Sequence, residues 1–138
     1  MKQIDLDVKN DVGIKGVDED HKAIFNYIEK LQNIVNQPHN HEYAITILES
    51  FIAFFLEHTI KEEQLLLQYL PPKIVEDHIL LHQNELIFLD ESLQTLKVSL
   101  SSNNIRTIAA QLNKEFKKHI YRYDRNIMQK LIELKNSR

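Results

Sequence analysis

The stretch that decides the fold runs over residues 58–82, HTIKEEQLLLQYLPPKIVEDHILLH. It contains two pairs of polar residues four positions apart, His58 with Glu62 and His78 with His82, each within an otherwise apolar helical pattern. Residues four apart lie on one face of an α-helix, so each pair would direct two metal-ligand side chains the same way. The Pro-Pro dipeptide between the pairs ends one helix and lets the chain reverse. The stretch therefore predicts two antiparallel helices whose polar pairs face each other.

The composition is that of a soluble globular protein. The chain has 138 residues, which suits a single domain over residues 1–138 with one substantial core. Hydrophobic residues make up 43% and charged residues 27%, and the formal net charge is only −3. These values give no reason to expect nucleic acid or an anionic membrane as a partner. Cysteine is absent, which excludes disulfides and thiolate metal sites.

The distribution of apolar residues predicts a cytoplasmic location. The first residues, MKQIDLDVKND, lack the apolar core of a signal peptide. No uninterrupted apolar run approaches the ~18 residues that a membrane-spanning helix needs. We therefore expect a cytoplasmic protein that does not contact a membrane.

Four amphipathic segments predict four long helices. Glycine occurs only twice and proline three times, and all five fall between the periodic segments. Short connections between such segments predict an all-α, up-down-up-down four-helix bundle. Residues 1–17 would form an N-terminal arm, and residues 125–134 a short C-terminal helix that packs across the end of the bundle. The four expected helices cover about residues 19–36, 42–69, 72–99 and from 105 onward.

Two finer expectations concern the first and the last long helix. Asp18 is expected to cap the first helix, with Asp20 in its first turn, where acidic side chains are favourable. On the last long helix, Phe116, His119 and Tyr123 are expected to share the buried face, because they follow one another at helical spacing.

Polar, metal-binding types of residue recur on the buried faces of all four helices. Seven ligands are too many for one octahedral ion, but they suit two ions bridged by carboxylates. Imidazole and carboxylate without thiolate suit iron, manganese or zinc. One spacing is unusual: the last two residues of the set are five apart, about 140° around an ideal helix, so the helix must end or distort between them. The set consists of His21, His58, Glu62, His78, His82, His119 and Asp124.

Each residue of this set also has a purely structural interpretation. A lone histidine on an apolar face, such as His21, is more often a hydrogen-bonded core residue than a ligand. Asp124 could equally be the N-cap of the terminal helix. Among the remaining polar residues, His39 and His41 lie in a polar turn and are interpreted as solvated, and Glu63 as a surface residue or a partner behind the ligands. Only the joint pattern favours a two-metal site.

The motifs resemble those of the hemerythrin family, in particular single-domain bacterial hemerythrins. The segment VGIKGVDEDHK, residues 12–22, contains the first histidine of the set. H-x-x-x-E, H-x-x-x-H and H-x-x-x-x-D follow in the order found in that family. The resemblance covers essentially the whole chain. It implies a cofactor of two iron ions joined by an oxo or hydroxo bridge.

The resemblance also implies a role for each residue of the set. One iron would have three histidine ligands, the other two, and both carboxylates would bridge the ions. By ligand count, the iron with two histidines keeps an open position for O2. Phe116, one helical turn before the last histidine, would line the O2 pocket. The implied ligands are His78, His82 and His119 for one iron, His21 and His58 for the other, and Glu62 and Asp124 for both.

Three functional hypotheses are compatible with such a centre. The first is a non-enzymatic protein that binds O2 reversibly for carriage, storage, delivery or sensing. The second is a di-iron redox enzyme that acts on O2, peroxide or nitric oxide, and the third is an iron-storing bundle. The sequence shows no obvious general acid–base residue beyond the ligands, which favours binding over catalysis. Nothing in it indicates a protein partner or an electron donor.

Overall fold

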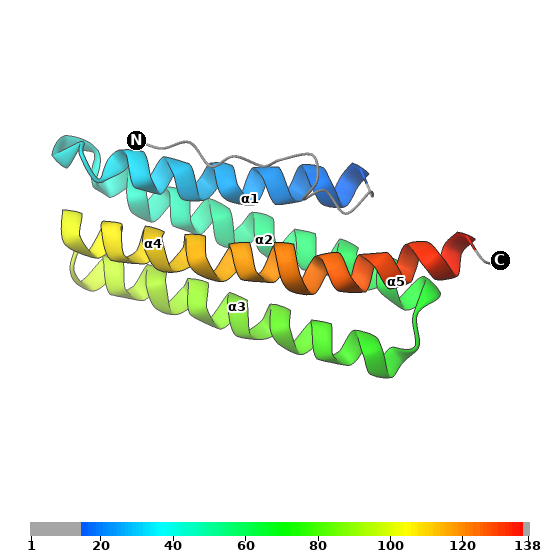
Figure 1. The fold of residues 1–138 in the computed structure, drawn as a ribbon. Helices are drawn as coiled ribbons and strands as arrows, with labels where there is room; N and C mark the ends of the chain where they lie inside the picture. The colour runs from blue at the N-terminus through cyan, green and yellow to red at the C-terminus, as the bar shows by residue number, and fades with distance from the viewer. Residues whose placement is uncertain (1–14, 137–138) are drawn as a thin grey trace.

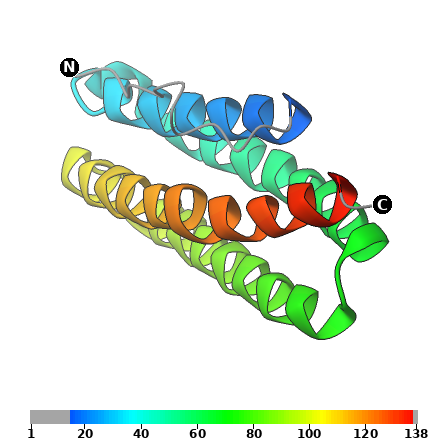
Figure 2. The ribbon, with the colours of Figure 1, turned by 45° about the vertical axis from the view of Figure 1, so that its right-hand side comes forward.

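The computed structural model of the protein describes residues 15–136. The helices pack side by side and alternate in direction, so the predicted all-α four-helix bundle is confirmed (Figure 1). Figure 2 shows the same arrangement after rotation, and the most extensive packing is between α2 and α3, while α1 packs against both α2 and α4. The elements in chain order are α1 (Lys15–Ile34), η2 (Pro38–Asn40), α2 (Glu42–Tyr69), α3 (Pro72–Val98), α4 (Ser102–Lys118), η3 (His119–Asp124) and α5 (Arg125–Asn136).

The turn between the two central helices lies where the Pro-Pro dipeptide predicts it. Helix α2 covers the expected residues, and α3 starts at Pro72, since proline is tolerated at the first helical position. Helix α4 starts at Ser102, three residues earlier than expected. The reason is its cap: the Ser101 hydroxyl accepts a hydrogen bond from the Asn104 N–H at 3.1 Å, which satisfies one free donor of the first turn.

The first helix begins earlier than its periodicity predicts. Residues 15–17, assigned to the arm, are already helical, while the rest of the predicted arm lies outside the described residues. Asp18 therefore lies within the first turn of α1 and does not cap the helix, so that expectation was wrong. A carboxylate in the first turn is still favourable, because it faces the positive end of the helix dipole.

The C-terminal segment also differs from its prediction. Helix α5 continues the direction of α4 through η3 and does not cross the end of the bundle (Figure 1). Its apolar face nevertheless closes that end. Ile127, Met128 and Leu131 are buried against Leu66 of α2 and Val75 of α3.

Two apolar clusters enclose a buried polar layer. On α2, the buried Phe55 belongs to the larger cluster and Leu66 to the smaller one, while His58 and Glu62 lie between them along the helix. The other long helices repeat this order of large cluster, polar residues and small cluster. Every helix therefore contributes polar side chains at the same level of the bundle.

Helix α2 has a further property that bears on the expected absence of a membrane span. It is long and apolar enough to cross a membrane by length and composition alone, and among the described residues one helix meets this criterion. Core helices of soluble proteins meet the same criterion. In this structure the buried face of α2 packs into the bundle between α1 and α3.

The core assignment predicts unequal losses of stability for two leucines. Leu112 is completely buried, whereas Leu67 is 51% exposed. Replacing Leu112 with alanine should lower the free energy of unfolding by about 2–5 kcal/mol, because a buried cavity remains. Leu67→Ala should change it by about 0.5 kcal/mol or less. Urea unfolding of the metal-free protein, followed by circular dichroism, measures both, and equal losses would contradict the assignment.

Candidate metal centre

The structure brings together all seven residues that the sequence pattern singles out. None is more than 5% exposed. Their nitrogen and oxygen atoms form two groups, and within each group the atoms lie within 4.8 Å of one another. Both groups contain the same two carboxylates. The first group consists of Glu62, His78, His82, His119 and Asp124, and the second of His21, His58, Glu62 and Asp124.

Glu62 presents one oxygen to each group. Its Oε1 lies 2.6 Å from Nε2 of His78 and 3.2 Å from Nε2 of His82. Its Oε2 lies 2.9 Å from Nε2 of His58, one turn away on the same helix. The i,i+4 spacing on α2 thus places this carboxylate beside one histidine of its own helix and two of α3.

Asp124 divides its oxygens in the same way. Its Oδ1 lies 2.9 Å from Nε2 of His78 and 2.7 Å from Nε2 of His119. Its Oδ2 lies 2.9 Å from Nε2 of His21 on α1. Two carboxylates from different helices therefore lie between the same two sets of histidines.

A π-helical turn explains how Asp124 reaches the site. Residues His119–Asp124 form a π-helix, and the Arg125 N–H bonds the Ile120 carbonyl five residues back. A turn closed by i→i+5 bonds holds more residues than an α-helical turn, so residues five apart approach the same face. The helix distorts between these two residues, as their spacing requires. Because the helix runs on through Asp124, this residue is not the N-cap of a separate helix.

The donor atoms of the site fit metal ions. Buried polar atoms are nearly always hydrogen-bonded, and leaving one unpaired is costly. In this site, five nitrogen and oxygen atoms of the histidine and carboxylate side chains make no hydrogen bond, although atoms of opposite charge lie near them. Nitrogen and oxygen donors that converge in this way, without thiolate, form a ligand set for iron, manganese or zinc. The five unpaired atoms are His58 Nε2, Glu62 Oε2, His82 Nε2, His119 Nε2 and Asp124 Oδ1.

Two histidines of the site are oriented by carboxylates behind them. His58 Nδ1–H donates to Asp20 Oδ2 at 2.9 Å, and Lys61 Nζ contacts the same oxygen at 3.1 Å. His82 Nδ1–H donates to Glu63 Oε2 at 2.7 Å. Such bonds fix the tautomer with Nε2 facing the site. Glu63 is thus a partner behind a ligand-type histidine, one of its two predicted interpretations, while the contact of Asp20 was not predicted.

A third carboxylate, Glu85, was missed in the sequence altogether. It is 2% exposed, and its Oε1 accepts a hydrogen bond from His119 Nδ1–H. The available signal was its position three residues after His82, on the buried face of α3. A carboxylate on an apolar face needs a partner. That partner is on another helix, so sequence spacing does not reveal it.

Burial and ion pairing shift the pKa values of the site in opposite directions. Burial alone would lower the pKa of His78, but hydrogen bonds to Asp124 and Glu62 raise it to about 9. Burial likewise opposes a raised pKa for His119, yet the Asp124 carboxylate beside it holds that pKa well above the usual value. For Glu62, burial favours the neutral form, but the His58 imidazole and the other histidines around the carboxylate hold its pKa well below the usual value. In the metal-free site, His78 and His119 are therefore held as imidazoliums beside the Glu62 and Asp124 carboxylates.

Aromatic rings form one wall of the site. Phe55 lies 5.9 Å from the His58 ring and 6.0 Å from the His82 ring, measured between centroids. Phe116 stacks on His119 at 6.1 Å and packs edge-to-face on Phe55 at 5.1 Å. Phe116 therefore contacts one histidine of the first group, and Phe55 contacts both groups.

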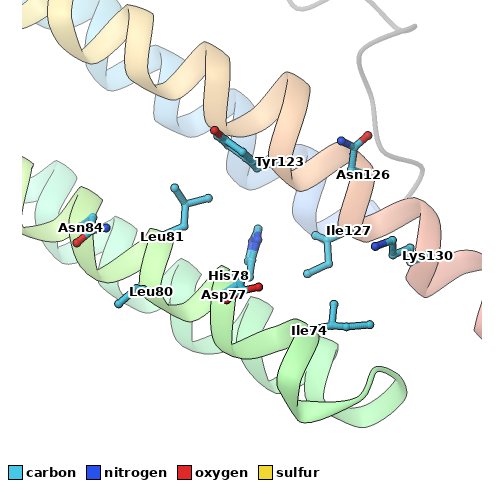
Figure 3. Close-up of a pocket in the computed structure, with 10 residues that line it drawn as sticks. All are labelled: Ile74, Asp77, His78, Leu80, Leu81, Asn84, Tyr123, Asn126, Ile127 and Lys130. Atoms are coloured by element: carbon cyan, nitrogen blue, oxygen red, sulfur yellow. The ribbon is translucent and has the colours of Figure 1, made fainter.

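Two of the other predicted positions, Tyr123 and His41, differ from their expectation. Tyr123 was expected on the buried face but is 36% exposed. It lines a surface cavity of about 450 Å³ between α3 and the η3–α5 segment, with His78 on its inner side (Figure 3). His39 is exposed as predicted, whereas His41 is half-buried and contacts the Val35 carbonyl at 3.4 Å.

A family model matches most of the chain. The family model described as the hemerythrin HHE cation binding domain matches residues 12–131. This range includes both groups of buried site residues. A search of curated proteins and a search of solved structures both found no match.

The raised histidine pKa values predict that metal binding releases protons. A metal needs an unprotonated nitrogen, but the pKa of about 9 keeps His78 protonated near neutral pH in the metal-free protein. Affinity for Co²⁺ should therefore rise between pH 6 and pH 8, by up to about tenfold per pH unit for each proton released. Calorimetry in buffers of different ionisation enthalpy measures the protons. The exposed His39→Ala variant should behave as wild type, and affinity that falls with rising pH would contradict the prediction.

Proposed function

Since this chain belongs to the hemerythrin family of cation-binding domains, we propose that its buried site holds two iron ions and binds O2 reversibly. Carriage, storage, delivery and sensing all use this same equilibrium. The proposal concerns the metal, its stoichiometry and its ligand, which go beyond the cation binding that the family membership establishes.

The observation that carries the proposal is the division of both carboxylates between the two histidine groups. A carboxylate that chelated one ion would direct both oxygens to it, whereas a carboxylate that bridges two ions presents one oxygen to each. Glu62 and Asp124 each place one oxygen beside each group. This supports two ions bridged by both carboxylates. The residues that would hold the ions are His78, His82 and His119 for one, His21 and His58 for the other, and Glu62 and Asp124 for both.

The unequal number of histidines supports a binding position at one ion. With both carboxylates and one bridging oxygen, His78, His82 and His119 would complete a six-coordinate ion, whereas His21 and His58 would leave one position free on the other. Two ferrous ions held by these residues would supply the two electrons that reversible O2 binding needs. A cavity of about 160 Å³ borders His58 and Glu62, next to the group with two histidines. This cavity gives a small ligand space beside His58. The larger cavity of about 450 Å³ borders His78 of the other group, so the ligand count, and not the cavities, assigns the open position.

The surroundings of the site support binding over catalysis. Phe55 and Phe116 are completely buried and present apolar rings to the histidines, which keeps water away from this wall of the site. The three carboxylates immediately behind the site, Asp20, Glu63 and Glu85, each accept a hydrogen bond from a histidine of the site. They therefore hold and orient histidines of the site.

The proposed function is tested by whether O2 binds reversibly to the iron-loaded protein. Protein loaded with Fe²⁺ under anaerobic conditions should contain two irons per chain. It should gain visible absorption on exposure to O2 and lose it on degassing, over repeated cycles. Immediate and irreversible oxidation, with O2 or peroxide consumed, would contradict reversible O2 binding and favour the redox enzyme. Less than two irons per chain at saturation would contradict both.

Removal of one bridging carboxylate should abolish the two-ion site. Glu62→Ala deletes an oxygen donor from each group, so we expect at most one firmly bound iron per chain. The exposed Glu57→Ala variant on the same helix removes the same charge and should still bind two. Iron analysis after gel filtration gives the stoichiometry. Two irons per chain in Glu62→Ala would show that the ligand assignment is wrong.

A further inference from the structure

Glu85 stands apart from the other carboxylates that contact the histidines. The Asp20 and Glu63 side chains, which accept from His58 and His82, are 16% and 23% exposed, so water screens their charge. The Glu85 side chain is 2% exposed, and its Oε2 has no hydrogen-bond partner. A charge buried in this way acts on its neighbours with much less screening.

The hydrogen bond to Glu85 determines the orientation of the His119 ring. The His119 ring lies nearly parallel to the rings of His82 and Phe116, with centroids 5.3 Å and 6.1 Å away. These contacts restrict the plane of the ring but do not distinguish the two orientations related by a 180° flip about Cβ–Cγ. The bond from Nδ1–H to Glu85 Oε1 selects one orientation and the tautomer, so Nε2 points toward Asp124 and the other site atoms.

A neutral hydrogen-bond acceptor would orient this ring equally well. A carboxylate differs from such an acceptor because it also carries a negative charge. Its negative charge makes the imidazole a stronger donor and lies beside the group with three histidines. Nearby negative charge favours the more positive of two metal oxidation states. Of the site's histidines, His119 alone has such a deeply buried carboxylate behind it among the described residues.

We propose that Glu85 is a positioning residue that fixes His119 toward one metal ion and, through its buried charge, stabilises the oxidised state of that ion. This inference rests on the proposed function, since it requires metal at the site. It assigns a role to a residue outside the ligand set. It also makes the two ions electrostatically unequal, with the added charge on the side away from the open position.

Two substitutions separate the orienting bond from the charge. Glu85→Leu removes both, and Glu85→Gln keeps an acceptor oxygen but removes the charge. Glu91→Gln, on the exposed face of the same helix, is the control for removal of one charge from α3. Each protein is titrated with Co²⁺ in the metal-free state, and its midpoint potential is measured after loading with iron.

The proposal predicts a different result for each variant. Glu85→Leu should bind one of its two Co²⁺ ions about 10- to 100-fold more weakly than wild type. Glu85→Gln should retain both ions but show a higher midpoint potential, by about 59 mV for each tenfold loss of preference for the oxidised ion. Glu91→Gln should match wild type in both measurements.

The outcomes distinguish failure of this inference from failure of the proposed function. A wild-type potential in Glu85→Gln overturns the inference, whatever the leucine variant does, because a residue with only a packing role would give that result. If Glu85→Leu does not fold, the midpoint potential of Glu85→Gln still tests the effect of the buried charge. If the wild-type protein itself does not bind two Co²⁺ ions, the two-metal site fails and the inference fails with it.

Discussion

The structure depends on how it accommodates two carboxylates in the middle of a helical bundle. Burying a charge costs several kcal/mol unless a partner compensates for it. Glu62 and Asp124 are almost completely buried, and each of their oxygens lies beside at least one imidazole nitrogen. All four long helical segments of the bundle must supply a partner at the same level. This requirement fixes how the helices align along the bundle axis.

The apolar clusters and the backbone geometry meet this requirement together. The larger cluster extends from the polar layer to one end of the bundle, and the smaller cluster closes the other end. Regular α-helical spacing is sufficient for α2 and α3, where the polar pairs are four residues apart. On the last helix the two site residues are five positions apart, and regular α-helical spacing would turn them to different faces. The π-helical turn His119–Asp124 brings both side chains to the same face. A local deviation from ideal helix geometry therefore completes the site.

Much of this could be predicted from sequence because its signals are local. The Pro-Pro dipeptide marks the end of α2 and the start of α3, and the spacing of histidine and carboxylate residues identifies the candidate ligands. Features set by contacts between distant segments could not be predicted. Glu85 finds its partner 34 positions away, on another helix. Tyr123 was misplaced because a constant rotation per residue assigns it to the buried face, whereas the π turn places Asp124 there. The start of α4 was misplaced because capping by Ser101, not periodicity, determines it.

The central claim is that the two carboxylates are shared between two metal ions. Anomalous diffraction at the iron absorption edge, from crystals of the iron-loaded protein, tests it most directly. The account predicts two iron peaks per chain, one bonded to His21 and His58 and the other to His78, His82 and His119, with Glu62 and Asp124 bonded to both. A single peak, or two peaks with each carboxylate bonded to only one of them, would contradict it.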